Sequence, residues 1–498
     1  MKFLLVLSFI ILFCYLGFSQ ETGFAIAESK EITGVRHSQN MAINSTVYTF
    51  PDKLNYFYLD TIAEVLTATC YDKPSILKDF FQKNNRTIFS FDLKGQKVKW
   101  TKRFSGQRDW LTCYPNFVIL SKVNGSYALN GETGQEKWEI PMTISMVDVE
   151  NRVALGYNNT DPMGIGINRL MGIDINSGIV LWQRKLVRTR GWGKVRYIDK
   201  NTALIVADGV HAVNVKDGTG WSFKTLTRNR FGWNFSNVLT DSTNCYFVSD
   251  ESLTCLEKSS GKLKWTHFFM DNLIGRAAIY FKDSAIVVIN ESEPNDKCTA
   301  IINGIAFIAA YHIKTGKEIY YQMISNRIPI SDYQAIRDTL WCLSVDRISK
   351  YSLRDGKLVS EKPLRIENAN QLYFADRHLF IKDTDSTYKQ LVACDSTQIF
   401  IGTDEKSVTA LNSKLEKVKQ YNIADLYVPY WAPEGCLFLK NDEKTIVIDK
   451  NLKEVATLNL KGRIKLIGNK LYKIVDNKLI ITDMKDVVDP CISYRLQN

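Results

Sequence analysis

Short apolar runs alternate with polar turns along most of the chain, and one arrangement of positions recurs. It consists of a hydrophobic pair, a polar anchor that is often Asp or Asn, a turn usually closed by Gly, and a strand that often ends in Trp. Clear copies begin at Phe91-Asp92, Leu129-Asn130, Ile173-Asp174, Val213-Asn214, Leu256-Glu257, Tyr311-His312 and Tyr351-Ser352, and degenerate ones at Leu411-Asn412, Ile448-Asp449 and Thr482-Asp483. Because Gly adopts positive φ without steric cost and Asp or Asn can accept hydrogen bonds from the amides of the turn, each copy predicts a β-hairpin.

The spacing of these copies predicts the architecture. Successive anchors are 34 to 60 residues apart, most of them near 40, which is the length of four short strands with their turns. Two wide gaps indicate insertions at Glu291–Gly304 and Asn368–Tyr388. Between the hairpins lie apolar runs such as Ala203–Val206 that are typical of buried strands. We therefore predict an all-β protein: a single large β-propeller of four-stranded blades, eight or more in number.

The recurring tryptophans admit two interpretations. Trp100, Trp138, Trp182 and Trp265 end the outer strand of their hairpins. An aromatic residue that repeats with the period of the fold favours a structural role, in which each ring covers the seam to the next blade. The alternative is a stripe of rings that binds a ligand.

The N-terminus predicts export. Residues 1–20 begin with Lys2, continue as an apolar run and end before polar residues, which is the layout of a secretory signal peptide. The propeller domain then spans residues 21–498, and no later segment is apolar for long enough to cross a membrane. We expect the mature chain to be periplasmic, displayed on the cell surface or secreted. The residues before Thr87 are expected to supply the first inner strands and a strand that closes the ring against the C-terminal blade.

The hairpin copies resemble the PQQ-like β-propeller repeat, whose pattern is roughly Ala-x-Asp-x-x-Thr-Gly-x-x-x-Trp. The segment Ala128–Trp138 matches it almost throughout, and Gly172–Trp182 and Ala310–Gly316 are similar. The resemblance implies a propeller over about residues 91–488. The family includes quinoprotein dehydrogenases, which bind pyrroloquinoline quinone and calcium, and non-catalytic scaffolds such as an outer-membrane assembly lipoprotein. The enzymes stack their quinone near a disulfide between adjacent cysteines, and this chain contains no Cys-Cys pair.

The composition and motifs of the chain indicate which kinds of binding and catalytic site to expect. The net charge of +11 over 498 residues is spread along the chain without a basic run, so nucleic-acid binding is not indicated. Five histidines form no metal-binding motif, and the nine cysteines after the signal are widely spaced. No nucleophile elbow or phosphate-binding loop is present. We therefore assign no catalytic residue, no metal site and no cofactor.

A second pattern gives a candidate binding site. Arg and Trp occur together in three segments that follow hairpins and precede the next inner strand. In a propeller these segments cross one face of the ring, so equivalent positions converge around the mouth of the central channel. Guanidinium groups and indole rings suit an anionic or sugar-like ligand. The alternative is a packing layer whose arginines are solvated or paired with nearby acids. The candidate residues are Arg108, Trp110, Arg190, Trp192, Arg230 and Trp233.

Three functions remain open at this stage. The leading hypothesis is an exported, non-catalytic propeller that binds a protein partner or an anionic glycan. A quinoprotein-like oxidoreductase is the alternative implied by the repeat alone. A polysaccharide lyase is a third, because such enzymes need a His or Tyr base beside Arg, and the chain has 23 tyrosines.

Overall fold

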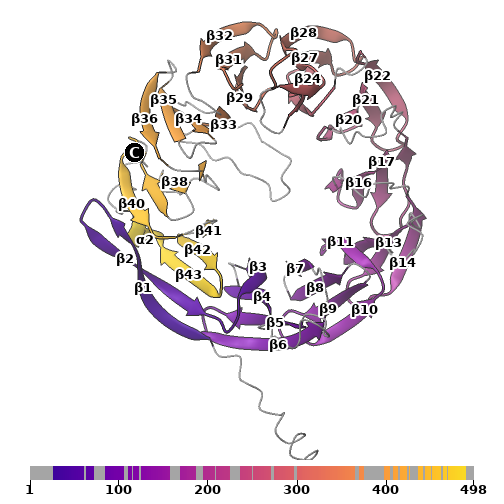
Figure 1. Cartoon of the computed structure of the whole chain (residues 1–498). Helices are drawn as coiled ribbons and strands as arrows, with labels where there is room; N and C mark the ends of the chain where they lie inside the picture. Colours follow the sequence, from indigo (N-terminus) through magenta and orange to yellow (C-terminus); the bar gives the residue numbers. More distant parts are fainter. Residues whose placement is uncertain are drawn as a thin grey trace, which may run out of the picture.

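The computed structural model shows a ring of small antiparallel sheets around a central opening (Figure 1). It describes residues 26–488 apart from internal gaps, at 61–62, 72–84, 106–109, 115, 123–124, 158–168, 187–194, 208, 225–235, 250, 271–273, 296–299, 365–368, 375–397, 404–407, 413–415, 423–424, 427–435, 441–443, 450, 461–463 and 468. Residues 1–20, the predicted signal peptide, lie outside the described residues.

Each blade has four strands arranged outward from the opening. The innermost strands are β3 (Leu54–Asp60), β7 (Trp110–Tyr114), β11 (Thr143–Asp148), β15 (Val195–Tyr197), β19 (Leu239–Thr240), β23 (Ala277–Lys282), β29 (Asp332–Ile336), β33 (Ala369–Phe374), β37 (Asp425–Leu426) and β41 (Ile464–Ile467). The second strands are β4 (Val65–Tyr71), β8 (Phe117–Lys122), β12 (Val153–Tyr157), β16 (Thr202–Val206), β20 (Asn244–Ser249), β24 (Ala285–Asn290), β30 (Thr339–Leu343), β34 (Gln398–Thr403), β38 (Leu437–Lys440) and β42 (Lys470–Val475).

The third and fourth strands form the predicted hairpins. The third strands are β5 (Asn85–Asp92), β9 (Gly125–Asn130), β13 (Arg169–Asp174), β17 (Val210–Asn214), β21 (Ser252–Glu257), β27 (Ala306–His312), β31 (Arg347–Ser352), β35 (Val408–Asn412), β39 (Thr445–Ile448) and β43 (Lys478–Asp483). The fourth strands are β6 (Lys97–Ser105), β10 (Glu136–Ile140), β14 (Val180–Lys185), β18 (Ser222–Phe223), β22 (Leu263–Phe268), β28 (Glu318–Ser325), β32 (Leu358–Pro363), β36 (Lys417–Tyr421), β40 (Glu454–Leu458) and β2 (Met41–Thr49). Every predicted anchor ends a third strand or follows it directly, so the repeat and the all-β propeller are confirmed.

The anchors organise the hairpin turns as expected. In the turn after β13, Asp174 Oδ1 accepts hydrogen bonds from the backbone N–H groups of Asn176 and Ser177, at 3.0 and 2.8 Å. Four residues after the anchor, Gly178 has φ +74°, where a Cβ is unfavourable. The first copy differs, because the residue with positive φ is Gln96 (φ 53°) and not the predicted Gly95. Gln96 stands four residues after Asp92, so the distance from the anchor defines the left-handed position better than the nearest Gly does.

The tryptophans cover the seams between blades. Trp182 of β14 is 9% exposed, and its Nε1 donates a hydrogen bond of 2.8 Å to the carbonyl O of Val215 in the next blade. Its ring lies against two glycines, since a Cβ added to Gly172 or Gly218 would come within 2.2 or 2.5 Å of it. The same contact to the following blade is made by Trp100, Trp138, Trp221 and Trp265, and by the hydroxyl of Tyr320. The structural interpretation of the tryptophans is therefore confirmed.

The N-terminal strands close the ring. Thr46–Thr49 of β2 pair with β43, so β2 is the fourth strand of the C-terminal blade, as predicted. A further strand, β1 (Ala27–Arg36), pairs with β2 on one side and, through Gly34–Arg36, with β40 on the other. The two last blades thereby merge into one nine-stranded sheet beside eight four-stranded sheets among the described residues. Buried hydroxyls of Thr33, Ser45 and Thr482 link β1, β2 and β43.

The hydrophobic core is divided among the seams. The clusters of fully buried residues extend from one blade to the next, as where Ile279 and Tyr311 pack with Tyr246 and Leu253 of the preceding blade. The first predicted insertion contains a two-stranded sheet of β25 (Glu293–Pro294) and β26 (Ile301–Asn303). The second falls between β33 and β34, where residues 375–397 lie outside the described residues. A short helix, α2 (Met484–Val487), follows β43.

Candidate functional site

The predicted Arg and Trp residues fall on the connections between blades. The flanking strands show that each segment leads from a fourth strand to the next innermost strand, from β6 to β7, β14 to β15 and β18 to β19. We call the side of the ring that carries these segments the connection face. Trp110 begins β7, and its side chain is not among those described. Arg108, Arg190, Trp192, Arg230 and Trp233 lie outside the described residues. Their convergence on the channel mouth stays a prediction.

One further connection with an Arg is described, between β22 and β23. Arg276 precedes β23, and its side chain is 58% exposed. Its Nε lies 3.9 Å from Oε2 of Glu291, and its carbonyl O accepts a hydrogen bond of 2.7 Å from the Glu291 N–H. This arginine is therefore paired with a nearby acid, which was the alternative considered for the Arg segments.

The insertion with β25 and β26 is fixed to two connections of the same face. On the connection that precedes β23, Arg276 N–H donates to the carbonyl O of Ser292 at 3.5 Å, and the Arg276 carbonyl O accepts from Glu291 N–H at 2.7 Å. Ile301 N–H donates to the carbonyl O of Arg327 at 3.1 Å, on the connection that follows β28. Arg327 is exposed, and Ile302 of β26 is 69% exposed. The insertion therefore presents an apolar side chain beside exposed arginines.

Two tyrosines join the innermost strands below this insertion. The hydroxyl groups of Tyr280 in β23 and Tyr333 in β29 lie 2.9 Å apart. Burial raises the pKa of Tyr280 to about 12 and that of Tyr333 well above its usual value, and the charge of Glu291 adds to both shifts. A tyrosine that acts as a general base needs a lowered pKa. These two hydroxyls stay protonated at neutral pH and hold the seam between their blades.

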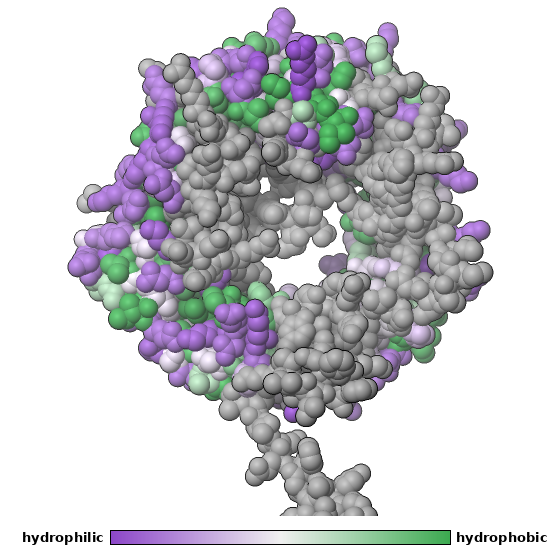
Figure 2. All heavy atoms as spheres, in the orientation of Figure 1, coloured by the Kyte–Doolittle hydropathy of each residue, from purple (hydrophilic) through white to green (hydrophobic). Residues whose placement is uncertain are grey.

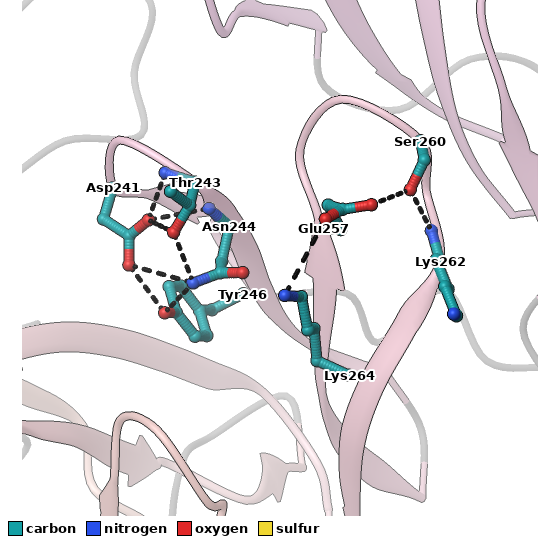
Figure 3. Close-up of polar contacts among 8 residues, drawn as sticks. All are labelled: Asp241, Thr243, Asn244, Tyr246, Glu257, Ser260, Lys262 and Lys264. Carbon is teal, nitrogen blue, oxygen red and sulfur yellow. Dashed lines mark hydrogen bonds and ion pairs between the residues drawn. The ribbon is translucent and has the colours of Figure 1, made fainter.

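The carboxylates of the turns are occupied by hydrogen bonds within their own blades. Figure 3 shows Asp241, which accepts hydrogen bonds from the backbone N–H groups of Thr243 and Asn244, both at 2.7 Å, and from the Tyr246 hydroxyl at 2.7 Å. Burial opposes its ionisation, but these donors outweigh burial and lower its pKa. In the neighbouring turn Glu257 accepts from Ser260 and lies 3.7 Å from Lys264 Nζ. The hydrogen bonds of these two acids stabilise their turns.

The described side chains do not fit the quinone and calcium of the dehydrogenases in this family. Within the described ranges, no three His, Cys, Asp or Glu side chains come together as metal ligands. Six described cysteines are buried free thiols, namely Cys70, Cys113, Cys245, Cys255, Cys342 and Cys436. Burial raises the pKa of Cys113, Cys245 and Cys255 to about 12 in each case. Such thiols are neutral and unreactive.

Exposed apolar side chains on the outer rim were not predicted from the sequence. Side chains of the fourth strands in three successive blades are exposed, with Phe268 at 63%, Met323 at 47% and Val359 at 61%. Figure 2 shows apolar side chains among polar ones on the upper part of the ring, where Figure 1 places β28 and β32. The alternation of Ile319, Tyr321 and Met323 along β28 was the available signal.

Comparison with known proteins identifies the repeat. Residues 80–267 match the model of a family described as outer membrane protein assembly factor BamB. The chain is a β-propeller built from PQQ-like repeats. No curated protein sequence matches it. The matched part covers the first hairpin copies, from β5 through β22.

Three solved structures with distant similarity to this PQQ-like propeller are the following. BamB from Moraxella catarrhalis is 12% identical, with 75% of this chain and 96% of that chain covered and a TM-score of 0.37. A eukaryotic initiation factor is 11% identical, with coverages of 80% and 93% and a TM-score of 0.40. The computationally designed Ika8 protein is 12% identical, with coverages of 77% and 100% and a TM-score of 0.33. Among the described residues of the propeller, no helix is long and apolar enough to cross a membrane.

Proposed function

We propose that this propeller is exported and acts as a non-catalytic scaffold that binds a protein partner through its connection face. The observation that carries the proposal is the insertion with β25 and β26, which two connections hold in place and which exposes Ile302 beside Arg276 and Arg327. An exposed apolar side chain on a segment that is bonded to connections carrying arginines is typical of a protein interface. The partner is expected to present an acidic surface around an apolar residue.

Two further observations support binding over catalysis. Asp241 is hydrogen-bonded within its turn, and Cys245 is one of six described cysteines that are buried free thiols. The matched family is described as an assembly factor, which is a role in binding other proteins. The undescribed segments with Arg190 and Trp192 belong to the same face by topology, and we propose that they extend the binding surface.

The proposal is tested by comparative capture from the host's exported fraction. The full chain is used as bait together with the variants Ile302→Asp and Arg327→Glu, and bound proteins are quantified by mass spectrometry. We expect a partner whose capture falls at least about tenfold with both variants. The matched control is Val418→Asp in β36, since Val418 is 54% exposed on the outer rim, and its capture is expected to equal that of the native chain. Equal capture by all four proteins would contradict the proposal.

Glycan binding and oxidoreductase activity are tested by two further assays. Binding to alginate that is lost with Arg190→Ala and Trp192→Ala, without a captured protein, would support an anionic glycan instead. Dye reduction after addition of pyrroloquinoline quinone and calcium would support an oxidoreductase. We expect neither result.

A further inference from the structure

The edges of the fourth strands are protected in two different ways. Most of these strands carry Lys or Arg, which oppose edge-to-edge pairing because a second strand would have to bury the charge. The strands with such a residue are β6, β10, β14, β22, β32 and β36. Of the fourth strands without one, β18 is only two residues long, and β2 and β40 are covered by β1. Where a fourth strand of five or more residues lacks a cation, this chain covers it with another strand.

The strand β28 is the exception to this rule. Its eight residues, Glu318–Ser325, include no Lys, Arg or Pro, and it stands at the end of its sheet with no fifth strand beside it among the described residues. It lies on the outer rim of the ring (Figure 1). Ile319, Tyr321 and Met323 project from one side of it and are 50%, 38% and 47% exposed. A long edge without Lys, Arg or Pro that exposes apolar side chains is a site for strand addition.

The pattern of β28 fits a second copy of itself. In an antiparallel pair centred on Tyr321, Ile319 of each copy lies opposite Met323 of the other, and the two Tyr321 rings face each other. The only charged residue, Glu318, then lies opposite Ile324, so no like charges meet. The pairing with β27 is regular from Tyr320 to Met323 and irregular on either side, so the regular edge is the four-residue stretch that contains Tyr321. Gln322 Nε2 donates to the Met323 carbonyl O at 2.7 Å, a bond that a backbone N–H of a second strand can replace.

We propose that two copies of this chain associate through antiparallel pairing of their β28 strands. The two blades then form one continuous sheet across a two-fold axis at Tyr321, in the way that β1 already continues the sheet of β40. The contact leaves the connection face free, so it is independent of the proposed function. A single pair of eight-residue strands buries a small interface, and we expect a dissociation constant on the order of 10 μM.

The association is measured by analytical ultracentrifugation of the full chain from about 1 to 100 μM. We expect the mass to rise from that of a monomer to that of a dimer over this range. The variant Tyr321→Lys places two ammonium groups opposite each other and is expected to weaken association at least about tenfold. The matched control is Val359→Lys in β32, a 61% exposed residue of the neighbouring fourth strand, which is expected to change nothing.

A mixing experiment separates pairing at Tyr321 from loss of folding. Tyr321→Lys and Tyr321→Glu proteins are each expected to remain monomeric alone and to form a heterodimer when mixed, because opposite charges then meet at the axis. Equal melting temperatures of the variants and the native chain show that the fold is retained. A monomer at all concentrations, a dimer insensitive to Tyr321→Lys, or no heterodimer on mixing would each overturn the proposal. A monomer that instead binds an extended apolar peptide at β28 would also overturn it.

Discussion

Single residues at the seams decide how blades fit together. Trp182 lies between Gly172 of its own sheet and Gly218 of the next blade, and its Nε1 reaches the carbonyl O of Val215. One side chain therefore supplies both apolar contact and a hydrogen bond across the seam. The repeat places a similar residue in successive blades, which explains why Tyr320 can replace Trp where its hydroxyl reaches Leu353 O.

Substitution of Trp182 separates the two contributions. Trp182→Phe keeps a ring but removes the donor, and we expect it to lower the free energy of unfolding by about 1–2 kcal/mol. Trp182→Ala also leaves a cavity and is expected to cost about 3–5 kcal/mol. Urea denaturation followed by circular dichroism measures both values. Equal losses for the two variants would show that ring packing contributes little.

A hydrogen-bonded acid at the seam between two other blades makes the stability of the fold depend on pH. Asp148 of β11 accepts hydrogen bonds from the Tyr197 hydroxyl and from the Asn151 side chain at 2.7 Å. Burial raises its pKa, but these donors outweigh burial and the net pKa is lowered. A carboxyl whose folded pKa is lowered stabilises the fold above its unfolded pKa of about 3.9, and this contribution is lost as the pH falls through the folded value.

We therefore expect Asp148→Asn to be less sensitive to acid than the native chain. The difference in free energy of unfolding between them is expected to be largest at pH 7 and to shrink at pH 3. Urea denaturation at both pH values measures it, and Tyr197→Phe serves as a second variant that removes one donor. A difference that does not change with pH would contradict the assignment of Asp148.

Residue patterns predicted the turns well because the turn chemistry is local. The anchor Asp174 and the left-handed Gly178 act within five residues of each other, so spacing alone reveals them. The prediction of a left-handed Gly95 was wrong, because a Gly in a turn need not occupy the left-handed position. Gln96 occupies it instead.

Among the elements, β1 and β2 close the ring. The side chains of Ile43 and Val47 in β2 are fully buried in the core of the C-terminal blades. By contrast, β1 adds three paired residues to β40 and a partly exposed outer surface. The two strands therefore make different contributions to ring closure.

Stepwise truncation distinguishes these contributions. Removal of residues 26–40 takes away β1 and is expected to lower the melting temperature by only a few degrees. Removal of residues 26–50 also exposes the edge of β43 and removes four core side chains, Ile43, Val47, Tyr48 and Phe50, for which we expect a loss of at least about 4–10 kcal/mol. Thermal unfolding and hydrogen exchange at Leu479–Ile481 measure the effect. Equal stability of the two truncated proteins would show that β2 is dispensable for closure.

Sequence patterns predicted that an N-terminal strand would close the ring, but not that β1 would join two blades. Neither β1 nor β2 contains the hairpin pattern, so nothing local marks their partners. The exposed edge of β28 was not predicted for a similar reason. Its lack of Lys and Arg stands out only when it is compared with the other fourth strands.

At the scale of the whole molecule, the fold follows from the sequence far more completely than the site does. A repeat reports on contacts that recur in many blades, as at Trp138 and Ile175. A binding surface depends on positions that differ between blades, such as the insertion with Ile302, and on how distant segments meet. The six candidate residues illustrate this limit, because the repeat predicts that they lie between blades but does not determine what their side chains contact.

Ring closure also has a consequence for synthesis. Ser45 meets Thr482 across 437 residues of sequence, so the first strands to leave the ribosome must wait for almost the last ones before they find their partners. Until then the edges of β2 and β43 are open, and contacts of such long range form slowly. A nascent chain therefore carries unpaired strands throughout elongation, and chaperones that hold extended segments have their greatest opportunity to act on this protein before translation ends.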